Sequence, residues 1–172
     1  MLIVKSTTVF LKRFYDLNGE QIGTLTIAPW VGGARNGRLN LGHDDVAKLE
    51  LTGRTYRLEY EVSNLRSFGE NDIRYFLMDG TTVLATAAAY HHDNKRKWDL
   101  EIDSRSFELV NRSSWHRLRF ALMQDNAQVG EIQETTRLLA VTRTYEVRAP
   151  GSFDPVIQAF LYHLAAVRTN AS

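Results

Sequence analysis

The chain has 172 residues, of which 44% are apolar and 24% are charged, as in typical folded soluble proteins. Its 21 lysine and arginine residues nearly balance 20 aspartate and glutamate residues, which leaves a net charge of +1. Such a charge provides no global field for nucleic acid, so we expect no nucleic-acid partner. Because the sequence contains no cysteine, it excludes disulfides, thiolate zinc sites and cysteine nucleophiles.

Nothing in the sequence divides the chain into domains. A chain of this length can bury a substantial core, and its prolines occur only at positions 29, 150 and 155, without a Ser/Gly-rich linker. We therefore expect one domain over residues 1–172. The first residues, Met1 to Ser6, lack the long apolar segment of a secretory signal, which favours a cytoplasmic location.

The first predicted element is a hairpin that turns at Asn18-Gly19, a dipeptide that tolerates the positive φ of tight turns. After this turn, Ile22 and Leu25 lie three positions apart with Gly23 between them, which breaks the strict alternation of a strand. A β-bulge or a sharp bend in the strand explains both features.

Alternating apolar and polar residues predict a strand over residues 56–62, and Asp79-Gly80 predicts another tight turn. The next strand contains a run of small residues from Ala85 to Ala89. Small side chains there would allow a helix that carries Phe160 and Leu164 to approach closely. We therefore expect the C-terminal helix to pack closely against this strand.

Residues 97–102 and 117–122 alternate in the same way and predict two more half-buried strands. The weaker turn Asp125-Asn126 follows, and the step Val129-Gly130-Glu131-Ile132 repeats the pattern of the first hairpin. The same bent hairpin is therefore expected twice. The chain holds about a dozen candidate strands, more than one flat sheet usually accommodates, which predicts a barrel or a sandwich.

The C-terminal segment has the one clear helix pattern of the sequence. Asp154 can cap a helix, Pro155 suits its first position, and residues 156–168 contain only residues that a helix accepts. Apolar residues surround the axis instead of forming one stripe, which is the pattern of a helix buried on most sides. We expect a helix over residues 154–168 with the sheet wrapped around it.

Short strands with D-x-N-G-x-x-I-G hairpins extend from Phe10-Leu11-Lys12-Arg13-Phe14-Tyr15-Asp16 to an apolar helix introduced by Phe153-Asp154-Pro155. In this pattern the chain resembles the tubby C-terminal-like superfamily, which includes LURP-one-related proteins and phospholipid scramblases. The resemblance implies a mainly β fold, a closed antiparallel barrel of about twelve strands around a buried C-terminal helix. It also implies association with phosphoinositides or other membrane lipids.

The chain departs from the scramblases in two ways. It lacks the cysteines that carry their lipid anchors, and residues 149–154 offer too few acidic oxygens for a calcium loop. We therefore expect neither lipid scrambling nor calcium binding.

Two basic features are candidate sites for an anion or a lipid headgroup. Lys95-Arg96-Lys97 forms a compact positive turn that could meet a phosphate, with an ordinary solvated turn as the alternative. Arg143 lies in the apolar phase of its strand, together with Tyr145 and Val147. It either returns to solvent through a bulge, forms a structural ion pair, or faces a pocket that binds an anion.

Patterns for catalysis and metal binding are weak. His91-His92-Asp93, followed by Asp99 and Glu101, contains ligand-type residues, but adjacent strand residues face opposite sides, so we expect an ordinary hairpin end. No G-x-S-x-G elbow surrounds a serine, and no glycine-rich phosphate loop is present. We expect no catalytic residue, no metal and no cofactor.

The expected function is that of a non-enzymatic cytoplasmic binding protein, peripheral to a membrane, for phosphoinositide or other anionic lipid headgroups. Its expected partners are an anionic lipid surface or a protein. Two alternatives stay open: a small-molecule hydrolase whose site is assembled only in three dimensions, and a protein-interaction scaffold.

Overall fold

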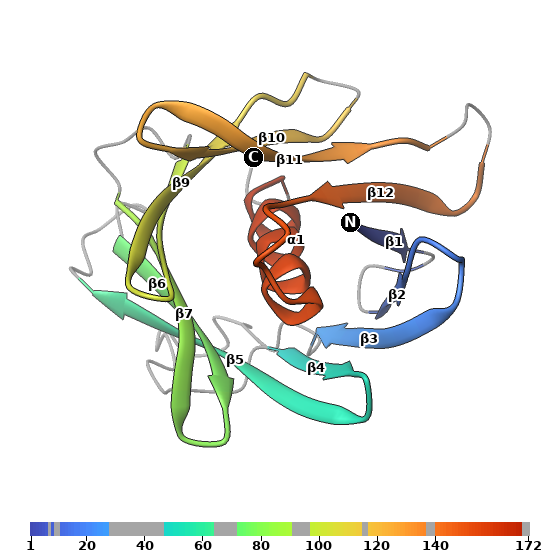
Figure 1. Cartoon of the computed structure of the whole chain (residues 1–172), viewed down its shortest axis with the longest axis horizontal. Coiled ribbons are helices and arrows are strands. Elements are labelled where there is room, and N and C mark those ends of the chain that lie inside the picture. The colour runs from blue at the N-terminus through green and yellow to red at the C-terminus, as the bar shows by residue number, and fades with distance from the viewer. Residues whose placement is uncertain are drawn as a thin grey trace, which may run out of the picture.

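The computed structural model describes residues 1–6, 8, 11–27, 47–63, 72–90, 97–114, 117–136 and 140–169, with residues 62, 63, 168 and 169 described by their backbone only. Within these residues, twelve antiparallel strands close into one barrel and one helix lies inside it (Figure 1). The strands follow one another around the barrel in chain order, and β1 closes it by pairing with β12. The predicted fold class is confirmed.

The elements are β1 (Leu2–Ser6), β2 (Leu11–Tyr15), β3 (Gln21–Ile27), β4 (Ala47–Leu51), β5 (Arg54–Ser63), β6 (Asp72–Asp79), β7 (Thr82–Ala89), β8 (Lys97–Ile102), β9 (Arg105–Asn111), β10 (Arg119–Gln124), β11 (Ala127–Glu134), β12 (Arg143–Arg148) and α1 (Pro155–Thr169).

Tight hairpins impose the up-and-down order of the strands. Positive φ angles occur at the predicted turns Asn18-Gly19, Asp79-Gly80 and Asp125-Asn126, where Gly19 has a φ of 84° and Asn126 a φ of 64°. Two further hairpins turn at Thr52-Gly53 and Asp103-Ser104, with positive φ at both residues of each pair. A two-residue turn reverses the chain direction at once, so the strands on either side of it pair as antiparallel neighbours.

Both predicted bulges are present and confirm the repeated hairpin. The register of the β2–β3 pair shifts after Phe14, so that Ile22 is the extra residue of β3. The register of the β10–β11 pair shifts after Leu122, and Val129 is the extra residue of β11. Bulges bend a strand and increase its twist, which helps the sheet to close.

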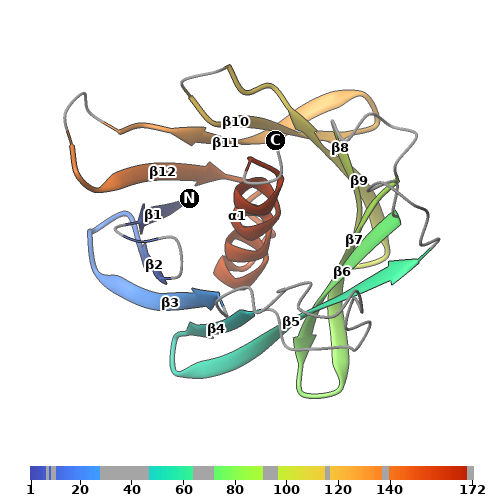
Figure 2. The same cartoon turned by 180° about the vertical axis from the view of Figure 1, so that it is seen from behind.

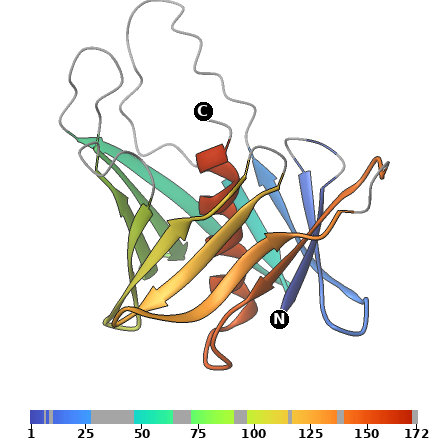
Figure 3. The same ribbon diagram turned by 90° about the horizontal axis from the view of Figure 1, so that it is seen from above.

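The C-terminal helix passes through the barrel, and Figure 3 shows the strands crossing obliquely around it. Helix α1 begins at Pro155, as predicted, and the carbonyl oxygen of Asp154 accepts the first hydrogen bonds from the N–H groups of Ile157 and Gln158. Phe160 and Leu164 are completely buried. Among the described residues, no helix is long and apolar enough to cross a membrane.

The helix was expected to approach the alanine-rich strand β7 closely, but its main contacts are with other strands. The helix lies nearest to β12, β1 and β4, and Figure 2 shows it on that side of the barrel. Ala87 does face the interior, but it pairs with Tyr75, whose ring packs edge-on against Trp98 at 5.5 Å and His163 at 5.6 Å. The small side chain of Ala87 therefore leaves space in the interior for these rings, whereas Ala88 faces outward.

Candidate functional site

Of the predicted basic turn, the structure describes only Lys97, while Lys95 and Arg96 lie outside the described residues. Lys97 begins β8, and its Nζ atom lies 2.7 Å from Oε1 of Glu108 and 3.2 Å from Oδ1 of Asp99. The hydrogen bond to Glu108, followed by that to Asp99, raises the pKa of Lys97. Two carboxylates therefore already neutralise this ammonium group.

Arg143 begins β12 and belongs to the last inward-facing row at one end of the barrel. Its strand partner is Ser6, which in turn pairs with Lys12, so the row runs from β12 across β1 to β2. The predicted inward phase of Arg143 is correct, since Tyr145 and Val147 in the same phase are buried. Its side chain is nevertheless 67% exposed because the row lies at the end of the strands.

Lys12 is the most unusual member of this row. The residue is only 7% exposed, and its Nζ donates hydrogen bonds to Oγ of Ser6 at 2.6 Å and to the carbonyl oxygen of Thr8 at 2.7 Å. Both acceptors are uncharged, and no carboxylate in the described part of the chain forms an ion pair with Lys12. Burial and then the nearby charge of Arg143 lower the pKa of Lys12.

One carboxylate completes the surroundings of the row. Glu134 lies opposite Tyr145 on β11, and its Oε1 atom is 4.0 Å from Nε of Arg143. A structural ion pair, one of the predicted alternatives, is thus present. A hydrogen bond with Tyr145 contributes most to raising the pKa of Arg143. We call Ser6, Lys12, Glu134, Arg143 and Tyr145 the barrel-end cluster, which holds two cations and one anion.

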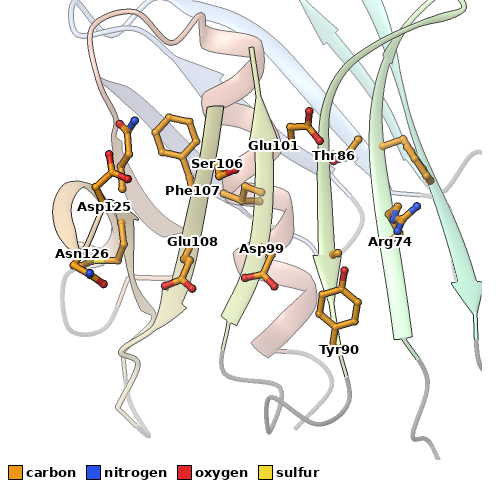
Figure 4. Close-up of a pocket in the computed structure, with 15 residues that line it drawn as sticks. Arg74, Thr86, Tyr90, Asp99, Glu101, Ser106, Phe107, Glu108, Asp125 and Asn126 are labelled. Carbon is orange, nitrogen blue, oxygen red and sulfur yellow. The ribbon is translucent and has the colours of Figure 1, made fainter. Parts of the chain in front are cut away.

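A hollow of about 700 Å³ lies elsewhere, on the outer face of β6 to β10 (Figure 4). Its central row follows the strand register from Arg74 through Ala88, Asp99 and Glu108 to Met123. Ala88 is small and leaves space between the longer side chains of Arg74 and Asp99 in this row. We call this hollow the outer groove.

The outer groove carries more acidic than basic groups. Asp99, Glu101, Glu108 and Asp125 line it, against Arg74 alone among the lining cations. Lys97 forms ion pairs with Asp99 and Glu108, whereas Glu101 and Asp125 form no ion pair with any described residue. The groove is therefore suited to a cationic ligand and would repel a phosphate.

The comparisons with family models, with curated proteins and with solved structures find no match to this chain. The resemblance to the tubby-like superfamily accordingly stays an expectation from the sequence.

Metal binding has no support in the described part of the chain, where no three His, Asp or Glu side chains are grouped to hold an ion. The segment His91-His92-Asp93, for which we weighed a metal site, lies outside the described residues.

Lys12 was not predicted as a site residue, although a signal was available. Lys12 lies between Phe10 and Phe14 in the apolar phase of its strand, which is the same signal that singled out Arg143. The outer groove had no comparable signal, because its side chains come from five strands and meet only through the register.

Proposed function

We propose that the protein is a non-enzymatic binding protein that takes an anionic group, the phosphate of a lipid headgroup, at the barrel-end cluster. The observation that carries this proposal is the burial of the Lys12 ammonium among uncharged oxygens. A buried charge without a counter-ion is costly, and a bound anion would offset that cost.

The two cations of the cluster differ in access, and this difference supports a binding role. Arg143 is mostly exposed, so its planar guanidinium can meet a phosphate in solvent and bind it through two parallel hydrogen bonds. Lys12 lies deeper in the same row and would then add a second positive charge. Glu134 opposes binding, but the cluster keeps one positive charge in excess.

The position of the cluster also suits a surface contact. Because the strands are antiparallel and follow in chain order, all even-numbered strands begin at the same end of the barrel. Lys12 in β2, Lys97 at the start of β8 and Arg143 at the start of β12 therefore share one end. Lys95 and Arg96 directly precede β8 in the sequence, and their contact with a headgroup stays a prediction.

Flotation of the purified protein with lipid vesicles tests the proposal. We expect binding to vesicles that contain phosphatidylserine or phosphoinositide, no binding to pure phosphatidylcholine, and weaker binding at high salt. Lys12→Met and Arg143→Gln should lose this binding. Lys48→Gln should retain it, because Lys48 is an exposed cation on β4 that already pairs with Glu50.

Soluble phosphate and inositol phosphate separate a free anion from a headgroup in a membrane. Retention of lipid binding by both Lys12→Met and Arg143→Gln would contradict the proposal, as would wild-type protein that binds neither vesicles nor soluble phosphates. Lys12→Met removes a buried charge at similar volume, so the variant should fold, and circular dichroism checks that it does.

A further inference from the structure

A second hollow, of about 420 Å³, lies next to the outer groove, beside the start of α1. Thr86 and Glu101 line both hollows, so the two adjoin at these residues, and we call them together the channel. The second hollow turns from the outer face toward the end of the barrel, since the buried Ala85 and Val156 also line it. The channel extends from the β10–β11 hairpin, at Asp125, to the first turn of α1, at Val156. A long, open channel fits an extended chain better than a compact small molecule.

The floor and walls of the channel offer apolar contact. Thr86, Ala88 and Ser106 are small residues that line it, and Figure 4 shows Thr86 on β7 and Ser106 on β9, on either side of β8. Phe76 and Met123 line the channel from strands on either side of these residues. A peptide backbone can therefore approach the sheet while its apolar side chains contact these walls.

The carboxylates of the channel favour a ligand that carries positive charge. Glu101 belongs to both hollows, Asp125 lies at one end and Asp154 at the other, and none of the three forms an ion pair with a described residue. Cationic side chains spaced along an extended peptide would meet these carboxylates in turn. Rim charges of this kind contribute modestly to affinity but strongly to the choice of partner.

We infer that the outer groove binds an extended segment of a partner protein in which lysine or arginine residues alternate with apolar residues. The proposed lipid site does not explain this surface. The outer groove is acidic, whereas the barrel-end cluster has an excess of positive charge. The groove also lies over β6 to β10, on the other side of the barrel from β12, β1 and β2 (Figure 1). The inference therefore stands independently of the proposed function and adds a protein partner to it.

Fluorescence anisotropy with labelled peptides tests this inference on the full chain. The probe is a heptapeptide in which lysine alternates with leucine, and a matched peptide with glutamate in place of lysine is the control. We expect the basic peptide to bind and the acidic one not to bind. The double variant Glu101→Gln with Asp125→Asn should weaken binding by about tenfold, because each lost charge removes part of the attraction.

Two further variants separate the groove from general surface charge. Ala88→Leu places a larger side chain at the bottom of the outer groove and should also weaken peptide binding, because it reduces the space for the peptide and leaves every charge in place. Glu50→Gln should bind as tightly as the wild type, because Glu50 is an exposed carboxylate on β4, outside the groove. Lipid flotation of the double variant should match the wild type, which distinguishes failure here from failure of the lipid site.

Three outcomes would overturn the inference. One is wild-type affinity in both the double variant and Ala88→Leu. Another is equal binding of the acidic and basic peptides, which would show that charge does not select the occupant. The third is binding of spermine without binding of the basic peptide, since a small polyamine would then be the ligand.

Discussion

His163 places a titratable ring in the fully buried interior of the barrel. Its exposed fraction is 0%, and among the described residues neither ring nitrogen has a hydrogen-bond partner. The ring packs edge-on against Tyr75 at 5.6 Å. Burial lowers the pKa of His163 to about 4, because a charged imidazole would lose its hydration there.

This histidine should make the fold sensitive to acid. The unfolded chain binds a proton at His163 below pH of about 6.5, whereas the folded chain binds it only near pH 4. His163 therefore does not reduce the free energy of unfolding while the pH stays above the unfolded pKa. It reduces this free energy progressively as the pH falls toward the folded pKa. The loss amounts to about 3 kcal/mol and is measured by urea unfolding between pH 7 and pH 4.

His163→Phe removes the titrating group and keeps a ring beside Tyr75, so its unfolding free energy should change less with pH than that of the wild type. Gln158→Leu is the control, because it replaces another buried polar side chain of α1 that does not titrate. An identical pH dependence in His163→Phe and the wild type would show that His163 does not cause the acid sensitivity.

At the scale of the elements, the two bulged hairpins depend on glycine for close strand contact. A Cβ atom at Gly23 would collide with the carbonyl oxygen of Glu50 on β4, and one at Gly130 with that of Arg148 on β12. Backbone atoms of a paired strand cannot move away without breaking the ladder. Gly23→Ala and Gly130→Ala should each lower the free energy of unfolding by about 1–3 kcal/mol, measured with urea.

Gly151→Ala is the matched control for both hairpin variants. No atom lies within 4 Å of a Cβ built at Gly151, and its φ is not in the left-handed region, so stability should hardly change. Wild-type unfolding midpoints for Gly23→Ala and Gly130→Ala would mean that the bulges relax without cost.

The hairpins also show which local signals the sequence carries. Asn18-Gly19 and Asp79-Gly80 were predictable because their residues favour positive φ, and the glycine inside each bulge interrupts the alternation. Asp103-Ser104 was not predicted, because it has neither the glycine of those turns nor the asparagine of Asp125-Asn126, although both of its residues have positive φ. At such a turn the pairing of the flanking strands overrides the preference of the residues.

At the scale of the whole molecule, the sequence predicted the parts of the barrel better than their arrangement. The helix and its burial follow from apolar residues on all its sides, and about a dozen strands favour closure. The side on which the helix packs depends on how Tyr75, Trp98 and His163 share the interior. The outer groove likewise arises from the register of five strands, which no single segment encodes.

The helix should be necessary for the barrel, because it fills the space that the inner faces of the strands enclose. Phe160, Leu164 and Ala165 are completely buried, and Tyr162 contacts both Phe14 on β2 and Tyr145 on β12 through its ring. Without α1 the inner faces would be exposed to water, and the large apolar surface would favour collapse or aggregation.

A chain that ends at Gly151 should therefore lose its cooperative thermal transition and its near-ultraviolet circular dichroism. Leu164→Ala provides a graded version of the same change and should cost about 2–5 kcal/mol, because it leaves a cavity at a fully buried position. If the shortened chain unfolded sharply and kept its near-ultraviolet spectrum, the strands would be stable on their own. The helix would then be an insert in a self-supporting barrel instead of the core around which the barrel folds.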